Sequence, residues 1–171
     1  MAGTCATPDC YDPTKGNSKY CKVHKAIARQ NWKAKVQADA EERATRYARF
    51  ETAFDSARAV ASAAGKAFTP TPMTVVEPSN PLDDASPPRQ TWHVPEGVCG
   101  FAWVNVSPGN SSFARWLSKN GLAGKSYYGG VDIWISAFGQ SYERKMAAAE
   151  AMAEELRSSL NIKAYASGRL D

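Results

Sequence analysis

Residues 98–106 of the chain read Val-Cys-Gly-Phe-Ala-Trp-Val-Asn-Val. Small aliphatic side chains alternate here with Cys, Phe, Trp and Asn, which is the period-two pattern of a strand that is buried on one face. Residues 107–112 then supply a turn and a helix N-cap. A helix is expected to follow, with Phe113, Trp116 and Leu117 on one side and Gly121 after its end.

The residues after this helix complete one domain. Gly129 and Gly130 suit a two-residue hairpin turn between strands at residues 125–128 and 131–136. A helix at residues 140–160 and a last strand from residue 162 follow. The order strand, helix, hairpin, helix, strand is typical of the ferredoxin-like, split βαβ arrangement, so an α+β domain is predicted for residues 98–171. If Tyr127 and Tyr128 lie in a loop, three strands remain.

The alternation also predicts two different sheet faces, of which the helices cover the aliphatic one. The other, here called the aromatic face, carries Phe101, Trp103, Asp132, Trp134, Lys163 and Tyr165. Its aromatic surface is too large to be left without a function or a cover. Phe101, Trp103, Trp134 and Tyr165 could stack unpaired nucleic-acid bases. Alternatively, a second subunit, the long helix described next or the proline-rich arm covers them.

The region before this domain divides into two segments. Residues 25–66 lack Pro and Gly until Gly65 and are rich in Ala, Lys, Arg, Gln and Glu, which predicts one long helix. Tyr47, Phe50 and Phe54 recur at helical spacing and form an apolar stripe, a candidate cover for the aromatic face or a surface for self-association. Residues 67–97 hold most of the ten prolines and are expected to be a linker or irregular arm.

Residues 1–24 contain a metal-ligand pattern, Cys5, Cys10, Cys21 and His24, spaced C-x4-C-x10-C-x2-H. Three thiolates and one imidazole form a closed set that suits structural zinc. A segment this short cannot bury enough core to fold alone, so a metal would supply its stability. A disulfide within the cluster is the alternative, although a reducing compartment favours metal.

Positive charge is concentrated near these ligands. The net charge is +4, and residues 1–50 carry ten Lys and Arg against five acidic residues. A basic collar surrounds the ligands and continues along the helix: Lys15, Lys19, Lys22, Lys25, Arg29, Lys33 and Lys35. Such a surface could contact phosphates with strong salt dependence, or it could be an ordinary solvated helix face.

Catalysis is not expected. Cys99 and His93 are about 20 Å apart along an extended chain, too far for a nucleophile and base. Residues 107–112 lack the lysine of a phosphate-binding loop and are interpreted as an ordinary cap. Arg144 and Lys145, near a helix start, could face a phosphate or an acidic partner. The sequence shows no apolar run of membrane-spanning length and no signal peptide, so an intracellular protein is expected.

The ligand pattern resembles small Cys/His knuckles of phage proteins, some of which precede homing-type nucleases. The matching residues are Cys5, Cys10, Pro13, Cys21 and His24, followed by a basic helix. About 30 of the 171 residues are covered, and the His-Asn-His array of such nucleases is missing because His93 is the one other histidine. The C-terminal region looks like phage accessory proteins of unassigned role, through Tyr128-Gly-Gly, Gln140-Ser-Tyr-Glu-Arg-Lys and Ser167-Gly-Arg-Leu-Asp.

The sequence therefore predicts a non-enzymatic, zinc-containing accessory protein that binds nucleic acid. The alternative is a viral interaction factor whose knuckle and long helix bind a host or virion protein, such as a component of a ribosome or a polymerase. Salt-sensitive binding to a plain polynucleotide favours the first, and co-purification of a defined protein favours the second.

Overall fold

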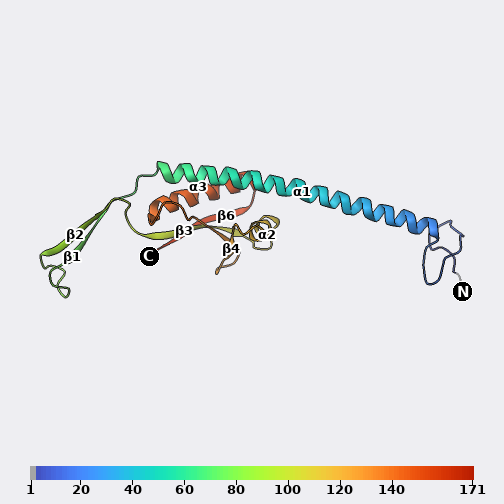
Figure 1. Cartoon of the computed structure of the whole chain (residues 1–171), viewed down its shortest axis with the longest axis horizontal. Coiled ribbons are helices and arrows are strands. Elements are labelled where there is room, and N and C mark those ends of the chain that lie inside the picture. The colour runs from blue at the N-terminus through green and yellow to red at the C-terminus, as the bar shows by residue number, and fades with distance from the viewer. Residues whose placement is uncertain (1–2) are drawn as a thin grey trace. The chain divides into compact units, whose positions relative to one another are not determined.

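The computed structural model describes residues 3–171 (Figure 1). The chain forms two compact units, one ending at Ala48 and the other spanning Arg49–Asp171. One long helix, α1 (Lys22–Ala67), passes through both units. The α+β class, this long helix, antiparallel sheets and two further helices agree with the sequence prediction.

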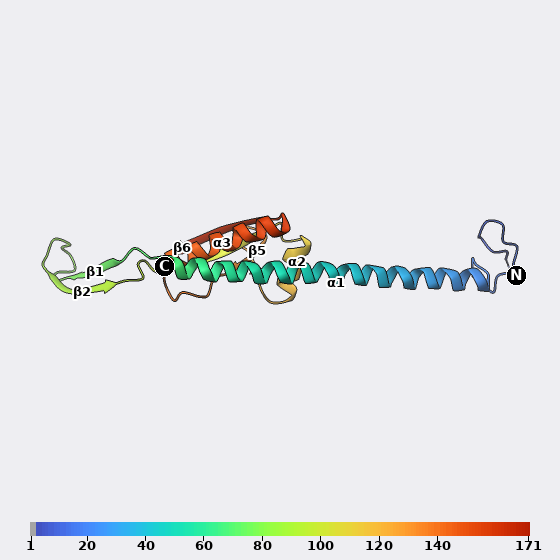
Figure 2. The same cartoon turned by 90° about the horizontal axis from the view of Figure 1, so that it is seen from above.

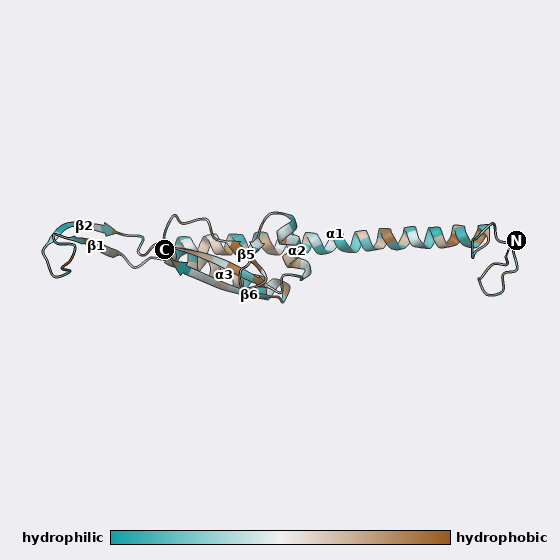
Figure 3. Ribbon diagram, turned by 90° about the horizontal axis from the view of Figure 1, so that it is seen from below, coloured by the Kyte–Doolittle hydropathy of each residue, from teal (hydrophilic) through white to brown (hydrophobic). Residues whose placement is uncertain are grey.

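The two parts of α1 differ in burial. From Lys22 to Arg49 its side chains are exposed or half-buried, and this part is mostly hydrophilic in Figure 3. From Phe50 onward one side of the helix is buried, at positions three or four residues apart. The buried residues are Phe50, Ala53, Phe54, Ala57, Ala61 and Gly65. The second part of α1 therefore belongs to a hydrophobic core, whereas the first depends on helix propensity and on its N-terminal end.

The C-terminal sheet has four strands in the order β4-β5-β3-β6, and every neighbouring pair is antiparallel. Helix α2 follows β3, and helix α3 follows β5, so the chain order is strand, helix, hairpin, helix, strand. The bounds are β3 Gly100–Ser107, α2 Ser112–Lys119, β4 Gly124–Lys125, β5 Val131–Trp134, α3 Tyr142–Leu160 and β6 Lys163–Leu170. The long strand β3 is central and pairs with both β5 and β6.

The core lies between this sheet and its helices. Helix α3 packs across β3 and β6, and α3 and β6 lie side by side in Figure 2. On the sheet side the buried residues alternate along β3, as the sequence predicts for a face beneath helices, and β5 adds two buried aliphatic residues. They are Ala102, Val104, Val106, Val131 and Ile133. Small side chains of α3, including Ala148, Ala149 and Ala153, are also buried and allow close approach of the helix to the sheet.

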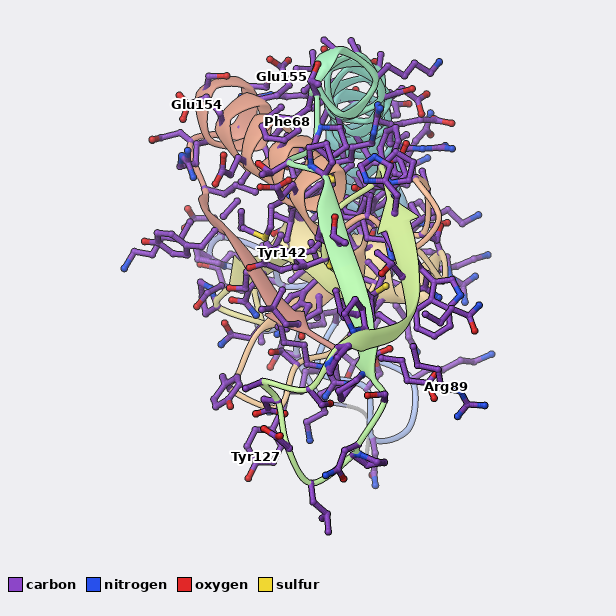
Figure 4. All side chains as sticks on the ribbon, turned by 90° about the vertical axis from the view of Figure 1, so that its left-hand side faces the viewer. Phe68, Arg89, Tyr127, Tyr142, Glu154 and Glu155 are labelled. Carbon is purple, nitrogen blue, oxygen red and sulfur yellow. The ribbon has the colours of Figure 1, made fainter. Side chains whose placement is uncertain are left out.

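The apolar stripe of α1 packs on α2. The Phe50 ring lies 5.2 Å from the Phe113 ring, and the Phe54 ring lies 6.0 Å from the Trp116 ring, both edge to face. On the neighbouring side of α1 the Ser56 hydroxyl donates to Glu155 on α3 at 2.8 Å, and Figure 4 shows Glu155 beside α1. Phe50 and Phe54 of the stripe are thus covered by α2 and do not cover the aromatic face.

The hairpin between β4 and β5 is wider than the predicted two-residue turn. Tyr127 and Tyr128 lie in the loop and are 93% and 88% exposed, yet β4 keeps two residues, so the sheet has four strands. Gly130 adopts a φ of +81°, and a Cβ atom there would lie 2.5 Å from the carbonyl oxygen of Val106. Glycine at this position therefore allows the loop to approach β3 closely.

Residues 67–97, expected as a linker or irregular arm, contain a two-stranded antiparallel hairpin. Strand β1 (Met73–Pro78) pairs with β2 (Pro88–Val94), and the register shifts at Pro78. Prolines lie at the ends of these strands, where a missing N–H costs least. The base of the hairpin is attached to α3, because Glu143 accepts a hydrogen bond from the Thr71 backbone N–H at 2.6 Å.

Arg144 joins three segments of the chain at the start of α3. Its Nε donates to Glu96 at 2.8 Å, and its Nη1 donates to the carbonyl oxygens of Gly65 and Lys66 at the C-terminal end of α1. The acidic partner suggested by the sequence is therefore Glu96 of the same chain. Lys145 is buried and donates to the Gly100 carbonyl at 2.9 Å.

We expect Arg144→Ala to lower the free energy of unfolding by about 1–3 kcal/mol, because two helix-end carbonyls and one carboxylate lose a charged donor. Arg46→Ala is the control. Arg46 forms an exposed ion pair with Glu42, and both residues lie on α1, so this substitution should change the free energy of unfolding by about 0.5 kcal/mol or less. Urea unfolding measured for both variants checks the difference. Equal stability of the two variants would contradict the structural role of Arg144.

Candidate functional site

The metal-ligand segment is built by backbone hydrogen bonds that bring the ligands together. Thr14 is buried and donates through its N–H and its hydroxyl to the Gly3 carbonyl, at 2.7 and 2.8 Å. The Cys5 N–H donates to the Asp12 carbonyl at 3.1 Å, and the Ala6 N–H donates to the Lys19 carbonyl at 2.8 Å. These bonds place Cys5 beside the chain that leads into α1.

The other end of the site is the first turn of α1. Cys21 directly precedes the helix, and its carbonyl accepts from the Lys25 N–H at 3.0 Å. The three-residue spacing places His24 on the same side of this turn, with Nδ1 3.3 Å from the Cys21 sulfur. The Cys21 N–H also points at the Cys5 sulfur, 3.3 Å away. A metal bound here would therefore fix the N-terminal end of the helix.

The four ligand atoms lie close enough together for one metal ion to bind them all. The Cys10 and Cys21 sulfurs are 3.9 Å apart, and His24 Nδ1 lies 3.5 Å from the Cys5 sulfur. All four atoms lie within 4.8 Å of one another. Zinc bonds of about 2.3 Å to sulfur and 2.0 Å to nitrogen place tetrahedral ligands about 3.5–3.8 Å apart. All four cysteines of the chain are free, so the cluster is compatible with zinc and contains no disulfide.

The ionisation of the thiols also favours a cation. A hydrogen bond with the Thr7 hydroxyl lowers the pKa of the Cys5 thiol to about 6, against an opposing effect of burial. The Asp12 backbone lowers the pKa of Cys10, but desolvation and the neighbouring sulfurs of Cys5 and Cys21 outweigh this effect and raise the pKa to about 11. Adjacent thiolates repel one another, and a divalent cation bound between them would offset that repulsion.

The basic collar is exposed along the loop and the first part of α1. All seven residues are exposed, and none of the ion pairs found between residues 3 and 171 involves them. Lys22, Lys25, Arg29 and Lys33 project within about 80° of one another at 3.6 residues per turn. They form a stripe about 16 Å long, whereas Lys35 lies on another side of the helix. Trp32, 64% exposed, projects beside this stripe.

The aromatic face is open in the structure. Trp134 is 53% exposed and Tyr165 is 54% exposed, while Phe101 and Trp103 are half-buried among one another and their neighbours. The Trp103 and Trp134 ring centroids lie 5.0 Å apart, and Phe101 meets Trp134 edge to face at 6.3 Å. Tyr127, in the loop before β5, lies on the side away from α1 and α3 in Figure 4.

The strand register arranges this face in rows. Trp103 pairs with Trp134 on one side and with Ser167 on the other, and Asn105 likewise pairs with Asp132 and Tyr165. The two rows are about 6.8 Å apart, because they are two residues apart along the strands. A hollow of about 910 Å³, here called the aromatic hollow, lies over these rows. Its lining includes Trp103, Trp134, Tyr165, Asp132, Lys125 and Arg169.

Two polar residues lie in the floor of the aromatic hollow. Asp132 is 8% exposed, and its Oδ1 accepts from Asn105 Nδ2 at 2.7 Å. The same Asn105 nitrogen donates to the Gly129 carbonyl at 2.9 Å. Sequence reasoning places Asp132 on this face but does not single it out as a site residue. The available signal was an acidic residue inside the otherwise apolar strand Val131–Trp134.

The remaining candidates have structural positions. Ser111 caps α2 by accepting from the Ala114 N–H at 3.2 Å, which agrees with the ordinary cap expected there. His93 lies within β2, and Cys99 forms an isolated bridge with Ser141 at the start of α3. No helix within residues 3–171 is both long enough and apolar enough to cross a bilayer.

Comparison with protein-family models, curated proteins and solved structures found no match to this chain. The resemblance to phage proteins therefore remains a prediction from the sequence.

Proposed function

We propose that the protein is a non-enzymatic binder of single-stranded nucleic acid. Unpaired bases stack on the aromatic face, and the basic stripe of α1 contacts phosphates. The zinc knuckle, Cys5, Cys10, Cys21 and His24, holds the N-terminal end of that helix in shape. The ferredoxin-like arrangement inferred for the C-terminal domain supports the same role, because it leaves one sheet face free of helices.

The observation that carries this proposal is the open aromatic face. Two tryptophans and three tyrosines line a hollow that is large enough for a small ligand, since such sites typically measure about 300–1,000 Å³. Aromatic side chains stack on any base, and each stacked base contributes roughly 1–3 kcal/mol. Lys125 and Arg169 line the same hollow and add positive charge near the position of a phosphate. Stacking surface and cations thus occur together, as single-strand binding requires.

The basic stripe gives a test of the phosphate contacts. We expect wild-type protein to bind a fluorescent single-stranded oligonucleotide of about 10 nucleotides, with affinity that falls as salt rises. Replacing Lys25, Arg29 and Lys33 together with Gln should reduce the slope of log affinity against log salt by about 2, because each phosphate contact on a single strand contributes about 0.7. Fluorescence anisotropy at several salt concentrations measures the slope.

A control with the same net charge separates local contacts from a general charge effect. Arg58, Lys66 and Lys119 are exposed and lie outside the basic collar, so their joint replacement with Gln should leave most of the slope unchanged. Equal slopes for the two triple variants would contradict a contact through the stripe. If no oligonucleotide, single- or double-stranded, binds at low salt, the proposed function is wrong.

A protein partner is the second candidate. Trp32, Val23 and Val36 are exposed on the first part of α1, and such apolar side chains on a helix favour contact with another protein. Nuclease treatment distinguishes the two functions in a pull-down from lysate. A defined protein that stays bound after nuclease treatment, and is lost on Trp32→Ala, would favour this candidate.

A further inference from the structure

We propose that the aromatic hollow selects guanine among the unpaired bases of a single strand. This inference rests on the proposed function and adds a base preference to it. Its basis is the pair Asp132 and Asn105 in the floor of the hollow, whose hydrogen-bonding groups are arranged by the register of β3 and β5.

The floor of the hollow presents hydrogen-bond acceptors. Both N–H groups of the Asn105 amide are directed to acceptors of this chain, Asp132 Oδ1 and the Gly129 carbonyl. The remaining Asn105 atom is the carbonyl oxygen, which accepts. Within the described residues, the Asn105 amide donates the one hydrogen bond found on the Asp132 carboxylate, so the second carboxylate oxygen has accepting capacity left. A ligand that reaches this floor therefore needs to bring donors.

Guanine fits such a floor better than the other bases do. Its Watson–Crick edge carries two adjacent donors, N1–H and the N2 amino group, which match the two oxygens of one carboxylate. Adenine and cytosine each pair an amino donor with a ring acceptor, and uracil places two acceptors around its one N–H. For these three bases a ligand acceptor would face the carboxylate, and one buried group would stay without a partner.

The walls and rim of the hollow suit the rest of a nucleotide. Trp134 and Tyr165 expose ring surface on which the base can stack, while Lys125 and Arg169 can approach its phosphates. The guanidinium carbon of Arg169 lies 5.2 Å from the centroid of the Phe101 ring, and this contact orients the arginine side chain. An aromatic cage for a methylated ammonium would also use Trp, Tyr and a carboxylate. The two cations at the hollow disfavour that ligand and favour one that carries phosphate.

The experiment uses full-length protein and an oligouridine of about 10 nucleotides that carries one central guanosine. Exchange of this guanosine for adenosine should weaken binding roughly tenfold or more, the discrimination expected from one bidentate pair. Exchange for inosine, which lacks only the N2 amino group, should give an intermediate loss. Deoxyribose versions of the oligonucleotides distinguish RNA from DNA as the source of the guanine. If free guanosine monophosphate competes as strongly as the oligonucleotide, the ligand is a nucleotide and the assignment to a single-stranded nucleic acid is wrong.

Asp132→Asn tests whether Asp132 determines the preference for guanine. The substitution keeps the shape of the side chain and replaces one acceptor oxygen with a donor amino group. We expect this variant to lose the guanosine preference, so that its affinities for the guanosine and adenosine oligonucleotides agree within about twofold. A preference retained in this variant would overturn the role of Asp132. Equal wild-type affinity for the guanosine, inosine and adenosine oligonucleotides would overturn the inference but leave the proposed function standing. If none of the three oligonucleotides binds, both the inference and the proposed function are wrong. The comparison of guanosine with inosine uses wild-type protein alone, so it does not depend on whether a variant folds.

Discussion

A Cys21→Ser variant is expected to purify with much less than one zinc ion per chain and to lose the structure of the ligand segment. Cys21 contributes a sulfur to the cluster and directly precedes α1. Loss of a group that merely supports a ligand costs about 10–100-fold in metal affinity, and loss of the ligand itself should cost more. Elemental analysis and titration with a chromophoric chelator measure the change.

The same variant should lose helix content. Between Lys22 and Arg49 no side chain of α1 is buried, so this part has little tertiary packing to support it. Helix formation has a costly first turn, and the metal would fix that turn through Cys21 and His24. We expect the far-ultraviolet circular dichroism at 222 nm to fall in Cys21→Ser and in chelator-treated wild type, while the thermal transition of residues 49–171 remains.

Cys99→Ser is the matched control for both measurements. Cys99 lies outside the cluster, at the bridge to Ser141, and its replacement should leave one zinc ion per chain and unchanged helix content. Wild-type zinc content in Cys21→Ser would refute the assignment of the ligands. Full helix content after complete removal of the metal would refute the role of zinc in holding the helix end.

The second large effect is expected for Trp134→Ala, which should weaken single-strand binding by roughly 5–100-fold. Trp134 is the more exposed of the two paired tryptophans. Loss of one stacked base costs about 1–3 kcal/mol of binding free energy. Trp134→Phe keeps a flat aromatic surface and should recover part of the affinity. Anisotropy with oligouridine at low salt measures both variants, and a thermal melt confirms that each is folded.

Trp92→Ala is the control for the loss of an exposed tryptophan. Trp92 lies in β2, opposite Val75, and is outside the aromatic hollow. We expect its replacement to leave affinity within about twofold of wild type. If Trp92→Ala and Trp134→Ala weaken binding equally, the aromatic face does not carry the interaction. Unchanged affinity in Trp134→Ala would mean that the basic stripe acts without stacking.

The close cluster of three cysteines and one histidine and the long helix could be predicted because their patterns are simple to recognise in the sequence. The spacing of Cys21 and His24 is one helical turn, and the Cys5 and Cys10 pair lies in a loop with turn residues, so the side chains have little freedom to separate. The absence of Pro and Gly over more than 40 residues similarly predicts a helix from composition. Neither inference needed knowledge of distant contacts.

The partners of each surface could not be predicted in the same way. Periodicity shows that Phe50 and Phe54 share a buried side, but it does not show what covers them, and the structure places them on Phe113 and Trp116. The role of Asp132 depends on its register with Asn105, which comes from pairing between strands distant in sequence. The hairpin of β1 and β2 was hidden because prolines at strand ends look like the prolines of a linker.

The position of those prolines affects how the hairpin behaves in solution. Each of its strands has one unpaired edge, and Val75, Val76 and Trp92 are exposed along them, a combination that invites pairing with strands of other molecules. Pro78 and Pro88 remove backbone donors at one end of this ladder, and Arg89 and Glu77 add charge beside them. We therefore expect these prolines to disfavour pairing of the free hairpin edges with strands of other molecules, and their replacement by residues with an N–H to increase self-association.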